Sequence, residues 1–206
     1  MAKVTHWDWQ SPKRMRALKT VEDHILWSYS LLSVSRRMMK ECKSSGANIL
    51  EGGRTKWATI EMSKYISGKR VISNLDRDDI LSHNGIRTCS HCGITLNDYH
   101  WDHLIPRKQL KGRYLALNQV LSCAACNQNR GAKDLMIWHS ERNTFPTLSV
   151  LRRYLKLCHQ YSHQNGILLM AIESAAESGM PFNPQHLPKK FPPIHDLVWD
   201  FAYPGI

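Results

Sequence analysis

Two cysteine pairs constrain this chain more than any other feature of its sequence. Cys89 and Cys92 form one CxxC pair, and Cys123 and Cys126 form the other. Each pair makes a knuckle whose two thiolates reach one cation, and two knuckles complete the tetrahedral set that zinc prefers. Gly93 suits the tight turn after the first pair. A redox-active pair is the alternative for either motif, but their doubling favours a zinc ion.

The spacing of the pairs indicates where other chemistry lies. Four protein thiolates leave no open coordination position for a substrate, so the zinc is expected to stabilise the fold. Thirty residues separate the knuckles, which leaves room for further structure between them. Cys42 and Cys158 have no such partner pattern and are expected to be buried as small apolar residues.

The segment between the knuckles carries a second motif. Tyr99 to Pro106 is predicted to form a strand that ends in Asp102-His103 and turns at the proline. Asn118 follows in Leu-Asn-Gln-Val-Leu-Ser-Cys, and Asn127 directly follows Cys126. Together these residues resemble the HNH, or His-Me finger, nuclease family. The resemblance covers about residues 86–135. The third signature position, often His in this family, is Asn127, and the usual Gly-Gly after the proline is reduced to Lys111-Gly112.

The resemblance implies a role for each residue of the motif. His103 would be the general base, and an ordinary histidine pKa near 6.5 suits that task at neutral pH. Asp102 and Asn127 would present oxygen ligands to one catalytic Mg²⁺ or Mn²⁺. Asn118 would hold the hairpin loop and so orient His103. Arg130 would act at the catalytic centre by neutralising phosphate charge.

Further contacts with DNA are expected around this centre. The candidate residues in the loop and after the helix are Arg107, Lys108, Lys111, Arg113 and Lys133, which would contact the phosphate backbone. A solvated basic face is the competing interpretation of the loop residues. By strand alternation His100 points the same way as Asp102, so it is a candidate ligand or substrate contact, or else an ordinary exposed histidine.

Charge favours a nucleic-acid partner. The chain has 28 Lys and Arg against 17 Asp and Glu, an excess that attracts polyanions. Residues 1–88 carry 16 basic and 9 acidic residues, 89–133 carry 6 and 2, and 134–206 carry 6 of each. A DNA-facing surface is therefore expected from the first two segments. Solubility alone is the other explanation of the excess.

The periodicity of apolar residues predicts helices over 21–43, 57–66, 77–82, 146–163 and 166–177. Thr20 is the expected cap of the first helix and Gly46 its stop. Six prolines after Gly179 predict an extended strap over the surface.

The expected fold is α+β: a ββα-metal finger with a structural zinc site of four cysteines, flanked by mainly α-helical segments. The expected domains are a basic helical region (1–85), the nuclease finger (86–140) and a helical region with a Pro-rich tail (141–206).

The sequence therefore predicts a metal-dependent DNA endonuclease in the cytoplasm, without a membrane partner. A nuclease for restriction or anti-phage defence is favoured, and a homing or phage-packaging nuclease is an alternative. Another class is a zinc-stabilised nucleic-acid-binding module without catalysis, and an RNA-directed or toxin nuclease is a further rival. One site per chain cuts one strand, so double-strand cleavage would need a homodimer or sequential attack. Other defence proteins are candidate partners.

Overall fold

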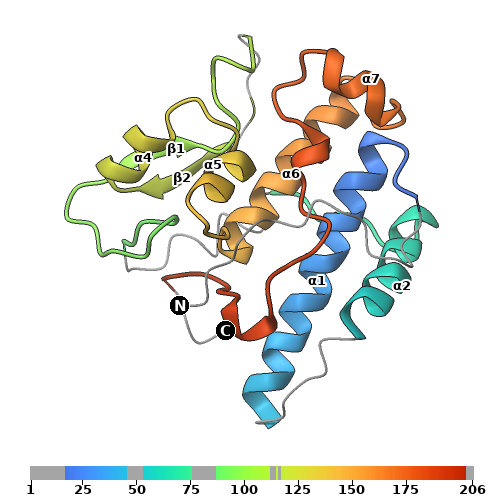
Figure 1. The fold of residues 1–206 in the computed structure, drawn as a ribbon, viewed down its shortest axis with the longest axis horizontal. Helices are drawn as coiled ribbons and strands as arrows, with labels where there is room; N and C mark the ends of the chain where they lie inside the picture. Colours follow the sequence, from blue (N-terminus) through green and yellow to red (C-terminus); the bar gives the residue numbers. More distant parts are fainter. Residues whose placement is uncertain (1–16, 46–52, 76–86, 112–114, 116, 203–206) are drawn as a thin grey trace.

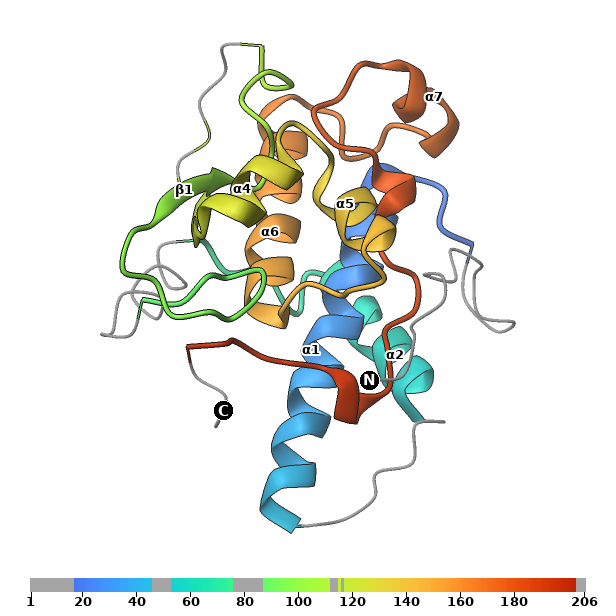
Figure 2. The same cartoon turned by 60° about the vertical axis from the view of Figure 1, so that its left-hand side comes forward.

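The computed structural model describes residues 17–45, 53–75, 87–111, 115 and 117–202. Its elements are α1 (Val21–Ser45), α2 (Arg54–Ile66), β1 (His100–His103), β2 (Gln119–Ser122), α4 (Ala124–Arg130), α5 (Leu135–Glu141), α6 (Leu148–Gln164), α7 (Ile172–Glu177) and the 3-10 turns η2 (Pro184–His186) and η3 (Ile194–Asp196). The hairpin and α4 lie on one side of the molecule and α2 on the other (Figures 1 and 2). The helix-rich α+β fold expected from the sequence is confirmed.

Three long helices confirm the predicted periodicity. The expected helices 21–43, 57–66 and 146–163 correspond to α1, α2 and α6, with ends that differ by a few residues. Thr20 caps α1, because its Oγ1 accepts from the amide of Asp23 while the Asp23 carboxylate accepts from the amide of Thr20. Cys158 is buried as expected, whereas Cys42 is half-buried. Gly46 and the expected helix 77–82 lie outside the described residues.

The predicted helix over 166–177 is wrong in its first half. Only Ile172–Glu177 is helical. Before it, the carbonyls of Met170 and Leu168 accept from the amides of Val21 and Glu22. Those amides belong to the first turn of α1, which has no acceptors within its own helix. The segment before α7 is therefore a cap for α1 rather than a helix.

The proline-rich segment contributes to the core, which corrects the expectation of a strap over the surface. It lacks long regular elements, as expected, but its apolar side chains are buried: Phe182, Leu187, Phe191, Ile194, Leu197 and Trp199. Its carbonyls also accept hydrogen bonds from the helices, since Pro188 receives the Ser28 hydroxyl and Lys189 the Trp27 indole. The apolar residues between the prolines thus anchor the segment against α1.

The hairpin is fastened to the helical body through α6. Arg153 donates to the carbonyl of Gln119 on β2 at 2.9 Å. The Tyr154 hydroxyl donates to the carboxylate of Asp134 at 2.8 Å, and the same carboxylate caps α5. Leu104 and Ile105, which follow β1, belong to the same buried cluster as the residues of α1 and α6. The position of the hairpin is therefore fixed by the main core.

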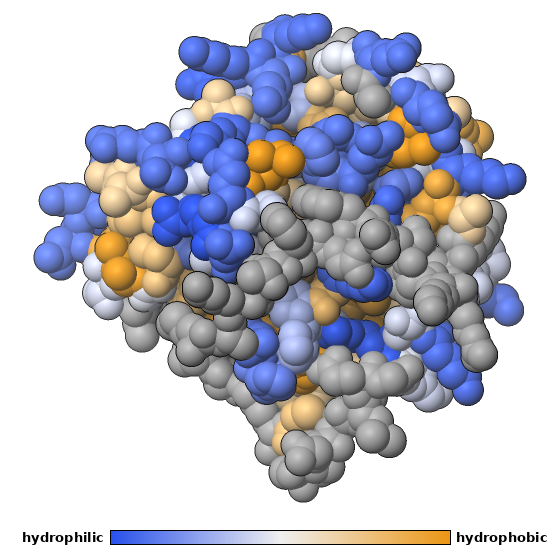
Figure 3. All heavy atoms as spheres, in the orientation of Figure 1, coloured by the Kyte–Doolittle hydropathy of each residue, from blue (hydrophilic) through white to orange (hydrophobic). Residues whose placement is uncertain are grey.

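The surface is mainly polar on the face that Figure 3 shows, where apolar residues emerge as small separate patches. Within the described part of the chain, no helix has both the length and the apolar character needed to cross a membrane.

Candidate functional site

The hairpin places Asp102 and His103 on opposite faces at the end of β1. The antiparallel register pairs Asp102 with Val120 and His103 with Gln119. Asp102 faces inward and is 3% exposed, whereas His103 is half-buried on the outer face. This arrangement follows from strand alternation, which sends neighbouring side chains to opposite faces. An inward carboxylate and an outward imidazole thus stand side by side.

Asn118 closes the loop beyond these two residues. Its amide oxygen accepts from the backbone N–H of Ile105, and its amide nitrogen donates to the Ile105 carbonyl, both at 2.8 Å. The backbone of Asn118 also accepts from the amide of Leu104 at 3.1 Å. A buried side chain that satisfies both polar groups of one residue fixes the backbone there. Asn118 therefore holds the chain two residues after His103.

Two side chains, those of Arg130 and His91, hold the Asp102 carboxylate in place. Arg130 Nη1 donates to its Oδ1 at 2.5 Å, and His91 Nε2 lies 2.8 Å from its Oδ2. Because an ionised carboxylate only accepts, Nε2 of His91 must carry the proton. Each carboxylate oxygen keeps one further lone pair. The two bonds therefore fix the orientation of Asp102 and leave it able to bind a cation.

His91 is a site residue to which the sequence prediction gave no role. It sits between the two cysteines of the first knuckle, and its side chain is fully buried. Its ring meets the edge of Trp138 at 5.1 Å between centroids and lies 5.8 Å from His139. In the sequence, only its position between two paired cysteines could have drawn attention to His91. Its contact with Asp102 could not be predicted, because that contact depends on how the knuckle folds against the hairpin.

Arg130 lies inside the protein rather than on its surface. It is 1% exposed, and besides Asp102 it donates to the carbonyls of His103 at 2.7 Å and Leu104 at 2.6 Å. These three bonds tie α4 to the end of β1. A direct contact with phosphate would require this guanidinium to leave all of them. Lys133 lies beyond the end of α4 and pairs with Glu141 at the surface.

The surroundings of His103 favour its neutral form. Burial lowers its pKa first, and the charges of Arg107 and Arg130 lower it further, while Asp102 opposes the shift. The side-chain nitrogen of Gln119 lies 3.0 Å from His103 Nε2. Since an amide nitrogen only donates, Nε2 accepts this bond. The basic nitrogen of the neutral ring is thus Nε2, and it must give up the bond from Gln119 before it can accept a proton from another donor.

Asn127 is the second residue that the sequence predicts as a ligand of the catalytic cation. It is half-buried on α4, three residues before Arg130. Residues three apart on a helix share a face, so Asn127 lies on the face of α4 that Arg130 turns towards Asp102. An amide oxygen and a carboxylate are ligands that Mg²⁺ and Mn²⁺ accept, and Mg²⁺ usually keeps several waters besides.

The four cysteines of the knuckles converge as predicted. Their sulfur atoms all lie within 4.8 Å of one another, and Cys92 Sγ is 3.9 Å from Cys123 Sγ. Tetrahedral zinc with bonds near 2.3 Å requires sulfur atoms about 3.8 Å apart. Burial raises the pKa of Cys126, and the neighbouring thiolates raise it further. Burial also raises that of Cys89, but hydrogen bonds from backbone amides bring it down to about 7.

This cluster is compatible with a structural zinc ion. Gly93 turns the first knuckle at φ +77°, as the sequence suggested, and its amide donates to the Cys89 carbonyl. A side chain at this position would collide with Phe201. The second knuckle begins α4, whose N-cap is Cys123. Any cation bound here would therefore join the start of α4 to the first knuckle.

The described residues among the other predicted DNA or metal contacts are more exposed than Asp102 and Arg130. Arg107, Lys108 and Lys111 are exposed in the loop after β1, and Arg113 lies outside the described residues. His100 is exposed at the start of β1.

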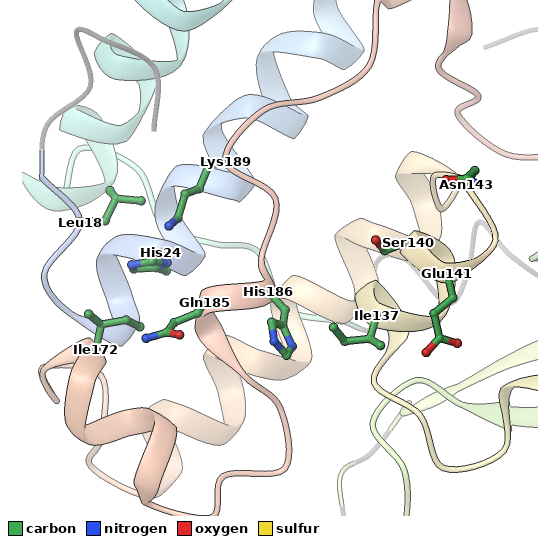
Figure 4. Close-up of a pocket in the computed structure, with 10 residues that line it drawn as sticks. All are labelled: Leu18, His24, Ile137, Ser140, Glu141, Asn143, Ile172, Gln185, His186 and Lys189. Atoms are coloured by element: carbon green, nitrogen blue, oxygen red, sulfur yellow. The ribbon is translucent and has the colours of Figure 1, made fainter. Parts of the chain in front are cut away.

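A hollow of about 780 Å³ lies apart from these residues, between α1, α5, α7 and η2 (Figure 4). His24, His186 and Lys189 line it, but none of the residues of the Asp102–His103 site does.

Comparison with known proteins agrees with the motif. Residues 89–133 match the family model of the HNH endonuclease, and the match begins at the first cysteine knuckle and extends past α4. No curated protein and no solved structure matches the chain.

Proposed function

Residues 89–133 carry an HNH endonuclease domain, and from this premise we propose that the protein is a metal-dependent endonuclease that hydrolyses phosphodiester bonds in DNA. The observation that carries the proposal is the geometry at the end of β1. There an inward carboxylate, Asp102, stands beside a neutral half-exposed imidazole, His103, within the matched segment. Hydrolysis needs such a base and a cation site at one place.

In this proposal each residue of the motif has one task. His103 accepts a proton from the attacking water at Nε2, which the Gln119 amide would first have to release. Asp102 and Asn127 hold one Mg²⁺ or Mn²⁺ ion, which would stabilise the charge of the reacting phosphate. Asn118 positions His103 through its two bonds to Ile105. The four cysteines hold a structural zinc ion, with no part in the reaction.

Arg130 is proposed as a positioning residue of this centre. It fixes the Asp102 carboxylate and the carbonyl of His103 at the same time. Arg107, Lys108, Lys111, Arg113 and Lys133 are proposed to contact phosphates along the substrate. Since the described part of the chain has one such centre, a monomer would nick DNA, and a double-strand break would need a homodimer or a second attack. Defence of a prokaryotic cell against foreign DNA is our proposed role, by analogy at the level of the family.

A cleavage assay with two substrates tests the proposal. Supercoiled plasmid and a folded RNA of similar mass are incubated with the zinc-loaded protein, with Mg²⁺, with Mn²⁺ or with neither. We expect nicked plasmid only when Mg²⁺ or Mn²⁺ is added, and little cleavage of the RNA. Faster cleavage of RNA would make the protein a ribonuclease. Binding of plasmid without cleavage under any of these conditions would support the non-catalytic binding module instead.

A further inference from the structure

The outer face of the hairpin carries two exposed aromatic side chains that contact each other. Trp101 is 45% exposed and Tyr99 is 37% exposed. Their rings meet edge to face, with centroids 5.7 Å apart. The guanidinium carbon of Arg87 lies 4.8 Å from the centroid of the Tyr99 ring. We call these three residues the aromatic patch.

The aromatic patch shares its face with the proposed general base. Trp101 and His103 are two residues apart on β1, so they point to the same side of the hairpin. Their separation along the strand is about 7 Å. Gln119 and Leu121, which pair with them on β2, are only partly buried, whereas the opposite face is covered at Asp102, Val120 and Ser122. A ligand can therefore lie across Trp101 and reach His103.

The charges around this face suit a polyanion. Arg87, Arg107 and Lys108 are exposed next to the hairpin, and the charge of Arg107 acts on His103. Asp98 is an exposed acidic residue beside Tyr99, so the basic residues outnumber it. Aromatic rings interleaved with cations are the pattern by which proteins bind single strands, since the rings stack on bases and the cations follow the phosphates.

We propose that the aromatic patch stacks on an unpaired base of the DNA strand beside the phosphate to be cut, so that the preferred substrate is single-stranded or locally unpaired DNA. A base inside a duplex is stacked on both of its faces, and a side chain can stack only on a base that has left the duplex. The proposed binding of an unpaired base is inferred from the exposed rings and the neighbouring basic residues. The link to cleavage rests on the proposed nuclease function.

Exposure of an aromatic ring does not by itself indicate a binding site, because single exposed apolar residues are common. Trp57 on α2 is 50% exposed and has Arg37 at 6.0 Å from its ring. The helix that carries it, α2, lies on the other side of the molecule from the hairpin (Figures 1 and 2). Trp57 therefore provides a matched control. It is an exposed tryptophan beside an arginine, but its helix lies apart from the hairpin that carries His103, the proposed general base.

The experiment measures affinity for two oligonucleotides in the His103→Ala protein, which prevents cleavage during the assay. One is single-stranded oligothymidylate, and the other is a blunt duplex of equal length. Trp101→Leu should lower affinity for the single strand by about 5- to 150-fold, as expected for the loss of one stacked base. Affinity for the duplex should change less than about 2-fold. Trp101→Phe should retain most of the single-strand affinity, and Trp57→Leu should change neither.

Equal losses on both oligonucleotides, or no loss on the single strand, would overturn the proposal. Leucine keeps an apolar side chain opposite Leu121, its partner in the strand register, and zinc content and melting temperature show whether the variant is folded. A second readout separates this inference from the proposed function. If the unmodified protein nicks plasmid with Mg²⁺ while Trp101→Leu cuts unpaired DNA at the normal rate, only the aromatic patch is refuted. If stacking is found but no cleavage occurs, the nuclease proposal fails and the binding inference stands.

Discussion

Replacing Arg130 by methionine should destabilise the fold severely. Methionine approximates the length and apolar volume of the arginine stem, but it removes the three donors that Arg130 directs at Asp102 and at the carbonyls of His103 and Leu104. Asp102 is 3% exposed and Arg130 is 1% exposed, so water cannot replace the lost bonds without opening the site. The carboxylate would remain buried without its cationic partner.

The magnitude follows from the burial of this pair. Removal of one partner of a buried ion pair costs about 3–5 kcal/mol, because the other charge is left uncompensated. For a chain of this size that corresponds to a fall in melting temperature of roughly 6–20 °C. Arg142→Met is the matched control. Arg142 is exposed and stacks on Trp138, so its loss should cost less than about 1 kcal/mol.

The assay is urea denaturation of the zinc-loaded proteins, followed by circular dichroism at one pH. If Arg130→Met is no less stable than Arg142→Met, the bonds from Arg130 do not hold α4 to β1. A loss of cleavage rate at unchanged stability would instead favour the direct phosphate contact that the sequence suggested for Arg130.

Two further predictions concern the zinc site and acid stability. Cys126→Ser should lose the single zinc per chain and melt at lower temperature, whereas Cys42→Ser should keep it; elemental analysis decides, and equal zinc in both would exclude the four-cysteine site. Burial and the charge of Lys189 lower the pKa of His24 to about 4. The unfolded chain therefore binds a proton that the folded chain does not, and stability should fall as pH drops from about 6.5 to 4, by at most about 3 kcal/mol. His24→Gln should flatten that part of the stability curve, and an unchanged curve would show that His24 is not responsible.

Short-range patterns in the sequence predicted the local features well. The paired CxxC spacing predicted four converging thiols, since each knuckle is made by adjacent residues. Periodicity predicted α1 and α6 for the same reason. The resemblance of the motif placed Asp102 and His103 in a segment that the HNH family model also matches.

Features that depend on tertiary contacts could not be predicted in this way. The bond from His91 to Asp102 joins two segments 11 residues apart, and only the folding of the knuckle against the hairpin brings them together. Arg130 has the residue type of a surface cation, and its burial follows from how α4 packs on β1. The segment before α7 is apolar enough to suggest a helix, but its carbonyls instead cap the first turn of α1. The apolar residues between the prolines did not reveal, from sequence alone, that the C-terminal segment packs into the core.

If His103 is the base of a DNA-cleaving centre, its replacement by alanine should slow the nicking of plasmid. With Mg²⁺ present, this variant should nick supercoiled plasmid about 10²- to 10⁴-fold more slowly than the unmodified protein, with unchanged zinc content, melting temperature and DNA affinity. His100→Ala, which alters an exposed histidine on the same strand, is the control for general damage to the hairpin. Nicking by His103→Ala at the unmodified rate would show that His103 is not the general base, even if the zinc site were confirmed.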